Sequence, residues 1–161
     1  MSAFYLTLPV SELTVAPTQT FPGCPDARLP FVSVVLAAYN EAVIRTALAD
    51  LRHSDYPASR LEVIAVNDGS TDEILQIMSN YARDWPQLRV ISQLNSGKSS
   101  ALNNGIDRAR PESTVIVTLD ADTLFRRSTI RTLARRFIRR RGNRIGAVAG
   151  HVKVGDRRSI H

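Results

Sequence analysis

The chain has 161 residues, of which 43% are apolar and 22% charged, with 21 Lys and Arg against 15 Asp and Glu. This size and composition indicate one ordinary soluble domain with its own core, and they exclude collagen, a coiled coil and wholesale disorder. The single cysteine forms no internal disulfide and no uncharged stretch reaches the roughly 20 residues of a membrane helix, so we expect a cytoplasmic location for the chain as given.

Residues 1–30 hold five of the eight prolines and show no strand or helix period, which predicts an irregular or disordered leader. From residue 31 to residue 161, apolar runs of strand length alternate with segments of helical period. This alternation predicts an α/β fold with a parallel, Rossmann-like sheet and flanking helices. The expected strands cover residues 32–37, 61–66, 88–92, 114–119 and 146–152.

A helix is predicted in each gap between these strands. Asn40 is the expected N-cap of the first helix, and Ser70 with Glu73 is the expected capping box of the second, because such side chains satisfy the first amides of a helix. The third helix is expected to begin near Lys98, and the fourth to cover about residues 128–141.

Polar residues collect directly after the expected strands. Ligands of open parallel sheets bind at the carboxyl ends of the strands, so these positions are the candidate site. The topology predicts that they share one rim. The residues concerned are Tyr39 and Glu41 after the first strand, Asp68 after the second, Lys98 at the start of the third helix, and Asp120 and Asp122 after the fourth strand.

Asp120 and Asp122 lie one residue apart at the end of an apolar run. Two hard oxygen ligands at this spacing suit Mg²⁺ or Mn²⁺ carrying a phosphate. Asp is also common where a strand gives way to a helix cap, and Asp-x-Asp is a short pattern. The pattern alone therefore leaves a metal site and a structural cap both open.

Asp68 opens the segment Asp-Gly-Ser-Thr-Asp, which a turn followed by a helix cap would explain. Only Ser70 is needed for capping, however. Asp68 is then free to accept a hydrogen bond from a ligand such as the imide N–H of uracil.

Lys98 lies in Gly-Lys-Ser, which is similar to the end of a phosphate-binding P-loop, but Ser92 stands where the first P-loop glycine belongs. A P-loop nucleotide binder is therefore a weak alternative. A lysine at a helix start serves as a point charge for a diphosphate, or it is a plain surface residue.

The positive charge is concentrated at one end. Residues 123–161 carry 12 basic side chains and one acidic side chain, whereas residues 1–122 carry 9 and 14, and nine arginines lie within 126–144. The fourth predicted helix presents these arginines around an apolar stripe. Such a run is a solvated face, or a surface for anionic lipid headgroups or nucleic acid.

Taken together, four segments resemble the motifs of the family 2 inverting glycosyltransferases with the GT-A fold, in the family's order. A closing segment, AGHVKVG at 149–155, is similar to the processive, membrane-associated branch that makes poly-N-acetylglucosamine, chitin oligosaccharides or hyaluronan. The resemblance covers residues 31–161. The four segments are VSVVLAAYNE at 32–41, VNDGSTD at 66–72, NSGKSSALN at 95–103 and LDAD at 119–122.

The resemblance implies the N-terminal, nucleotide-binding half of a GT-A fold, with roles that carry over by position. Ala37 departs from the proline usual before Tyr-Asn-Glu, which touches no chemistry. By this resemblance, Tyr39 and Glu41 border the nucleoside and Asp68 binds the uracil. Lys98 contacts the diphosphate and Asp120 contacts the donor. Asp122, together with Asp120, binds a Mg²⁺ or Mn²⁺ ion.

The resemblance also implies a UDP-sugar donor, with UDP-N-acetylglucosamine indicated by the branch. Full-length members are membrane proteins with this domain on the cytoplasmic face, and the arginine helix is a candidate contact for an anionic membrane. The family's general base is expected beyond His161, so we expect this chain alone to bind donor without transferring sugar. No nucleic acid is expected, although an arginine-rich module that binds nucleic acid or anionic membranes is the alternative function.

Overall fold

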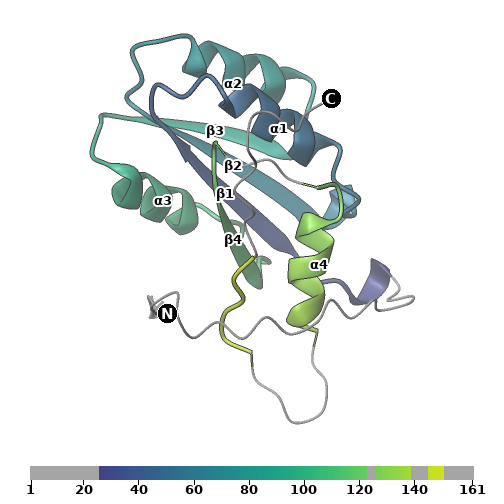
Figure 1. Cartoon of the computed structure of the whole chain (residues 1–161). Coiled ribbons are helices and arrows are strands. Elements are labelled where there is room, and N and C mark those ends of the chain that lie inside the picture. Colours follow the sequence, from purple (N-terminus) through teal and green to yellow (C-terminus); the bar gives the residue numbers. More distant parts are fainter. Residues whose placement is uncertain (1–25, 123–125, 139–144, 151–161) are drawn as a thin grey trace, which may run out of the picture.

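The computed structural model describes residues 26–122, 126–138 and 145–150. Within them a four-stranded parallel sheet has the order β3-β2-β1-β4 (Figure 1). The strands are β1 Val32–Ala38, β2 Leu61–Asp68, β3 Leu88–Gln93 and β4 Val115–Asp120. The helices are α1 Ile44–Arg52, α2 Ile74–Arg83, α3 Lys98–Asp107 and α4 Thr129–Arg136, with short 3-10 turns at Asp26–Arg28 and Ala58–Arg60. The predicted α/β class and the first four strands are confirmed.

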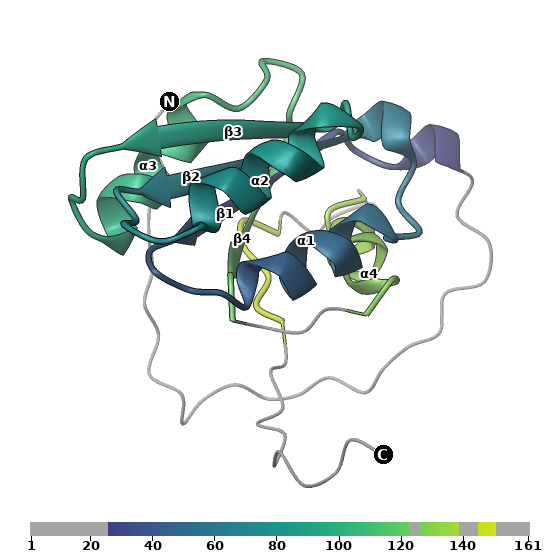
Figure 2. The same ribbon diagram turned by 90° about the horizontal axis from the view of Figure 1, so that it is seen from above.

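Helices cover both faces of the sheet. Figures 1 and 2 show α1, α2 and α4 on one face and α3 on the other. Successive side chains of β1 point to opposite faces, so Val34 and Leu36 pack with the first group of helices while Val35 and Ala37 pack with α3. Every residue of β1 and β2 is buried, as expected for the central strands of a sheet covered on both sides.

A buried carboxylate ties the amino end of the sheet together. Glu62, in β2, is 1% exposed and accepts hydrogen bonds from Ser33 Oγ at 2.8 Å, Arg89 Nη1 at 2.8 Å and the Arg110 amide at 3.0 Å. Burial raises the pKa of Glu62, but these contacts outweigh it and hold the pKa below its usual value. This network lies at the opposite end of β2 from the candidate rim and is structural.

The C-terminal elements differ from the prediction. Residues 145–150 form no strand, so the predicted fifth strand is wrong over that range, and its last two residues lie outside the described part of the chain. Helix α4 ends at Arg136, and residues 139–144 also lie outside. Most of the predicted leader lies outside as well, although Leu29, near its end, is buried in the core.

Neither predicted helix cap forms. The N-cap of α1 is Val43, and the N-cap of α2 is Glu73, whose side chain makes no capping hydrogen bond. Instead, Asp72 Oδ1 accepts from the Ile74 amide at 3.1 Å. Asn40 and Ser70 are used elsewhere, in contacts between two loops of the candidate site.

The helices of the described residues are short. The longest, α2 and α3, have ten residues each, whereas crossing a bilayer takes about 20. No helix in this part of the chain is long and apolar enough to span a membrane.

Candidate functional site

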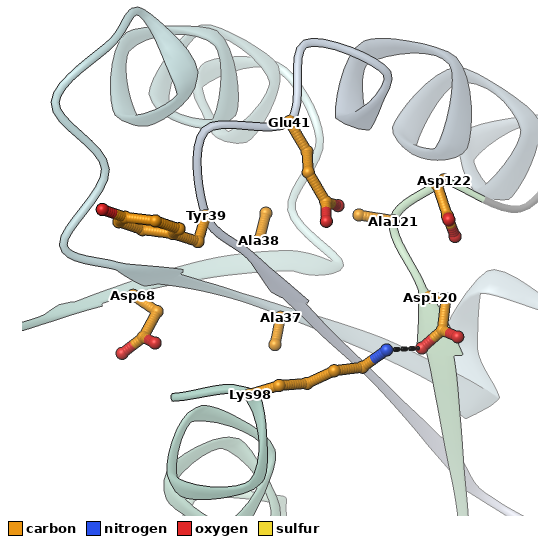
Figure 3. Close-up of a pocket in the computed structure, with 9 residues that line it drawn as sticks. All are labelled: Ala37, Ala38, Tyr39, Glu41, Asp68, Lys98, Asp120, Ala121 and Asp122. Atoms are coloured by element: carbon orange, nitrogen blue, oxygen red, sulfur yellow. Dashed lines mark ion pairs between the residues drawn. The ribbon is translucent and has the colours of Figure 1, made fainter. Parts of the chain in front are cut away.

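The carboxyl ends of β1, β2 and β4 and the first residue of α3 surround one pocket, called here the rim pocket (Figure 3). All six residues predicted from the sequence line it. Its lining consists of Ala37, Ala38, Tyr39, Glu41, Asp68, Lys98, Asp120, Ala121 and Asp122.

Parallel pairing explains why residues far apart in sequence meet here. In the sheet register Ala37 of β1 lies beside Asp120 of β4, and Ala38 lies beside Asn67 of β2. The chain then turns away at the same edge in each case, so the side chains that follow the strands gather there. Ala37, Ala38 and Ala121 are small and leave the space between the polar groups open.

The polar groups divide between two sides of the pocket. In Figure 3 the Tyr39 ring lies near Asp68 on one side, while Lys98 extends toward Asp120 on the other, with Asp122 and Glu41 beyond. Lys98 Nζ and Asp120 Oδ1 form an ion pair of 2.5 Å, with 59% and 54% of the two side chains exposed. The pair spans the pocket from α3 to β4.

Carboxylates outnumber cations on the Asp120 side. Burial raises the pKa of Glu41, the charges of Asp122 and Asp120 raise it further, and Lys98 acts in the opposite direction. This region therefore favours an added cation, because a cation would offset the repulsion among the three carboxylates.

The donor set fits Mg²⁺ or Mn²⁺ held together with a ligand. Among the described residues no group of three or more His, Cys, Asp or Glu side chains is arranged to hold a metal by itself. Asp120 and Asp122 supply two hard oxygen ligands at the pocket. Mg²⁺ is commonly bound through one or two carboxylates, with phosphate oxygens and water completing the shell.

Asp68 already has three protein partners, which the sequence did not predict. Its Oδ1 accepts from Gln93 Nε2 at 2.8 Å and from the Ser96 amide at 2.9 Å, and its Oδ2 accepts from the Gly97 amide at 2.9 Å. The residue is only 3% exposed, yet it lines the pocket. It joins the end of β2 to the loop that leads into α3.

A second link between loops involves two residues that were predicted as helix caps. The Asn40 amide donates to Ser70 Oγ at 3.1 Å, and Asn40 Oδ1 accepts from the Thr71 amide at 3.0 Å. Asn40 has a φ of 50°, a left-handed conformation that Asn tolerates better than most residues. Asn40 therefore fixes the turn between Tyr39 and Glu41, a role that local sequence does not reveal.

The arginines of α4 do not form one solvated face. Arg131 is tied to Asp26 at 2.7 Å and to Asp55 at 3.4 Å, so it joins α4 to two other segments. Arg126 and Arg127 are exposed. The remaining predicted face extends into residues 139–144, outside the described part of the chain.

The comparisons with known proteins identify a family. Residues 33–161 match the model of glycosyl transferase family 2. The poly-beta-1,6-N-acetyl-D-glucosamine synthase of Staphylococcus epidermidis is 31% identical over 130 residues, covering 80% of this chain and 30% of the relative. The beta-monoglucosyldiacylglycerol synthase of Nostoc sp. is 38% identical over 98 residues, covering 58% of this chain and 20% of the relative.

Solved structures match the fold. A mannosyltransferase from Pyrobaculum calidifontis, in complex with GDP-Man and Mn²⁺, matches with a TM-score of 0.64 and 28% identity. The match covers 74% of this chain and 36% of the mannosyltransferase chain. S. aureus TarS in complex with UDP-GlcNAc has a TM-score of 0.59 at 29% identity, covering 66% and 30%. The chain thus spans between 20% and 36% of the length of these proteins, and its sheet corresponds to the N-terminal part of GT-A transferases. The chain belongs to glycosyl transferase family 2.

Proposed function

We propose that this chain binds a UDP-sugar, together with Mg²⁺ or Mn²⁺, as the donor-binding part of an inverting glycosyltransferase. The observation that carries the proposal is the rim pocket itself, which combines an aromatic ring, a buried carboxylate, a lysine and an Asp-x-Asp pair. These groups suit, in that order, a nucleobase, its N–H donor, a diphosphate and the accompanying metal.

The base is assigned to the Tyr39 side of the pocket. Tyr39 is 46% exposed, so its ring offers a face for a nucleoside, and Glu41 borders the same turn. A carboxylate has about four acceptor sites, of which the protein contacts of Asp68 fill three. The remaining site can accept the N3–H of uracil. Cytosine presents only an acceptor at N3, so we expect UDP to bind about 1–3 kcal/mol more tightly than CDP.

The diphosphate is assigned to the other side. Lys98 provides a positive charge at the start of α3, Asp120 contacts the donor, and Asp122 with Asp120 holds the metal. When bound, the metal neutralises charge on the diphosphate leaving group. Lys98 adds to the same effect from the protein, and the pocket carboxylates orient the donor.

The finer assignment is a processive polysaccharide synthase that uses UDP-N-acetylglucosamine. Its supports are the segment 149–155 and the likeness to the Staphylococcus epidermidis synthase. We also propose that the domain works at a membrane surface. The acceptor and the residue that activates it are not assigned to the described part of the chain.

A P-loop nucleotide binder is disfavoured by the contacts of the loop before α3. A P-loop cradles phosphates with backbone N–H groups, but the amides of Ser96 and Gly97 donate to Asp68. The arginine-rich alternative predicts steep salt dependence and no response to UDP.

The proposal is tested by calorimetric titration of the 161-residue chain with UDP, with and without Mn²⁺. We expect Mn²⁺ to tighten UDP binding and Asp122→Asn to abolish that response. Asp107→Asn is the matched control, because Asp107 ends α3 on the surface and does not line the pocket. An unchanged metal response in Asp122→Asn would contradict the metal assignment, and equal affinities for UDP and CDP would contradict the role of Asp68.

A further inference from the structure

The contacts of Asp68 go beyond what recognition of a base requires. Its carboxylate receives three hydrogen bonds of 2.8 to 2.9 Å, and all three donors belong to the end of β3 or the loop that follows it. Asp68 and Gln93 are direct partners in the sheet register. The carboxylate therefore fastens the segment 93–97 to the end of β2.

Two glycines make this close approach possible. A Cβ on Gly69 would lie 2.6 Å from the Asn95 backbone nitrogen, and Gly69 has a φ of +73°. Gly97 has a φ of +88°, a backbone conformation that L side chains rarely adopt. The two loops are thus shaped for contact at the positions that flank the Asp68 hydrogen bonds.

The fastened loop leads directly to Lys98. Gly97 is the N-cap residue of α3 and has no side chain with which to cap it, and Lys98 is the first residue of the helix. The Gly97 amide, bonded to Asp68, therefore lies one residue before the lysine. From this fixed start Lys98 reaches Asp120 across the rim pocket.

We propose that Asp68 is a positioning residue for Lys98, holding the diphosphate-binding lysine in place by fastening the loop before α3. The inference rests on the proposed function and deepens it, since one carboxylate then serves both the base and the diphosphate. Replacing a residue that contacts only the base should not change the affinity for a ligand without a base. Replacing a residue that positions Lys98 should weaken the binding of such a ligand.

The probe is inorganic pyrophosphate with Mn²⁺, titrated into the 161-residue chain by calorimetry. Asp68→Asn places an amide NH₂ group against an N–H donor and breaks part of the fastening. We expect pyrophosphate to bind about five- to tenfold more weakly, the effect of roughly one ordinary hydrogen bond. The matched control is Asp72→Asn, which makes the same change in a carboxylate that accepts from the Ile74 amide outside the pocket. It should leave the affinity for pyrophosphate unchanged.

A double-mutant cycle separates positioning from a general structural effect. In a Lys98→Met background, Asp68→Asn should change pyrophosphate affinity by less than about twofold, because the residue on which it acts is gone. Gly97→Ala provides a second route if Asp68→Asn folds poorly. Its Cβ would meet no atom within 4 Å, so the change acts through backbone conformation and should also weaken pyrophosphate.

Each result bears on the inference. If Asp68→Asn lowers the affinity for UDP but not for pyrophosphate, Asp68 acts on the base alone. The inference then fails, while the proposed function stands. If the loss is as large in the Lys98→Met background, Asp68 does not act through Lys98 and the inference also fails. If the unmodified chain binds neither UDP nor pyrophosphate, the proposed function falls and the inference with it.

Discussion

Replacing Lys98 with methionine should change the affinities for two ligands in opposite directions. The substitution keeps a flexible side chain but removes the charge that faces Asp120 at 2.5 Å. Both side chains are more than half exposed, so the pair contributes at most about 1 kcal/mol to folding. We therefore expect the free energy of unfolding, measured in urea, to fall by no more than about that amount.

Without nucleotide, the loss of Lys98 leaves Asp120 unpaired and removes a competing cation. Mn²⁺ alone should then bind about two- to fivefold more tightly, which corresponds to an exposed ion pair of roughly 0.5–1 kcal/mol. UDP with Mn²⁺ should bind about ten- to hundredfold more weakly, since a hydrogen bond to a charged group contributes about 1.5–3 kcal/mol. Calorimetry at low ionic strength measures both affinities, because salt screens exposed charges.

Arg52→Met is the matched control. Arg52 forms a similar exposed ion pair with Asp84 at 3.1 Å, and neither residue lines the rim pocket. This variant should leave both affinities unchanged. A parallel fall in the affinities for Mn²⁺ and UDP in Lys98→Met would refute the reasoning, because it would mean that Lys98 supports the metal site instead of competing with it.

Three further outcomes are expected. Glu62→Gln should destabilise the fold by about 1–3 kcal/mol near pH 7, because the buried Glu62 carboxylate accepts hydrogen bonds from Ser33, the Arg110 amide and the half-exposed Arg89. The pKa of Glu62 is lowered in the folded chain, so its stabilisation is present above the usual pKa and is lost as pH falls through the folded pKa. Gly105→Ala should cost about 1–2 kcal/mol, because its Cβ would lie 2.5 Å from Val35 Cγ1 and the resulting strain exceeds the gain in helix propensity. The chain should sediment with anionic vesicles but not with neutral ones, and the sedimented fraction should fall at high salt. Replacing the exposed Arg126 and Arg127 with glutamine should also lower that fraction.

The measurements that check these outcomes are direct. Urea unfolding of the unmodified chain and Glu62→Gln between about pH 7 and pH 3 should show a smaller pH dependence in the variant, and equal slopes would contradict the role of Glu62. If the free energy of unfolding of Gly105→Ala equals or exceeds that of the unmodified chain, α3 shifts to accept the methyl group and the predicted strain is absent. Equal sedimentation with both kinds of vesicle would leave the exposed arginines as a solvated surface.

The sequence by itself was enough to predict the α/β class, four strands and the six polar residues that line the rim pocket. Central strands of a parallel sheet are buried on both faces, so β1 and β2 are apolar over most of their length. Parallel strands end at a common edge, so polar residues directly after those runs must gather there. Both inferences depend on local pattern and topology, which are properties that a sequence displays.

Only the tertiary structure decided how the polar residues are used. Asn40 and Ser70 are residue types that are common at helix N-caps. In the structure, however, their hydrogen bonds join the loop after β1 to the loop after β2. Asp68 looks free in sequence, yet its donors lie 25 to 29 residues further along the chain. A hydrogen-bonding side chain has several possible partners of similar energy, and the folded backbone determines which one lies within reach. Local pattern therefore identifies the residues of the site, whereas contacts between distant loops determine what each of them does.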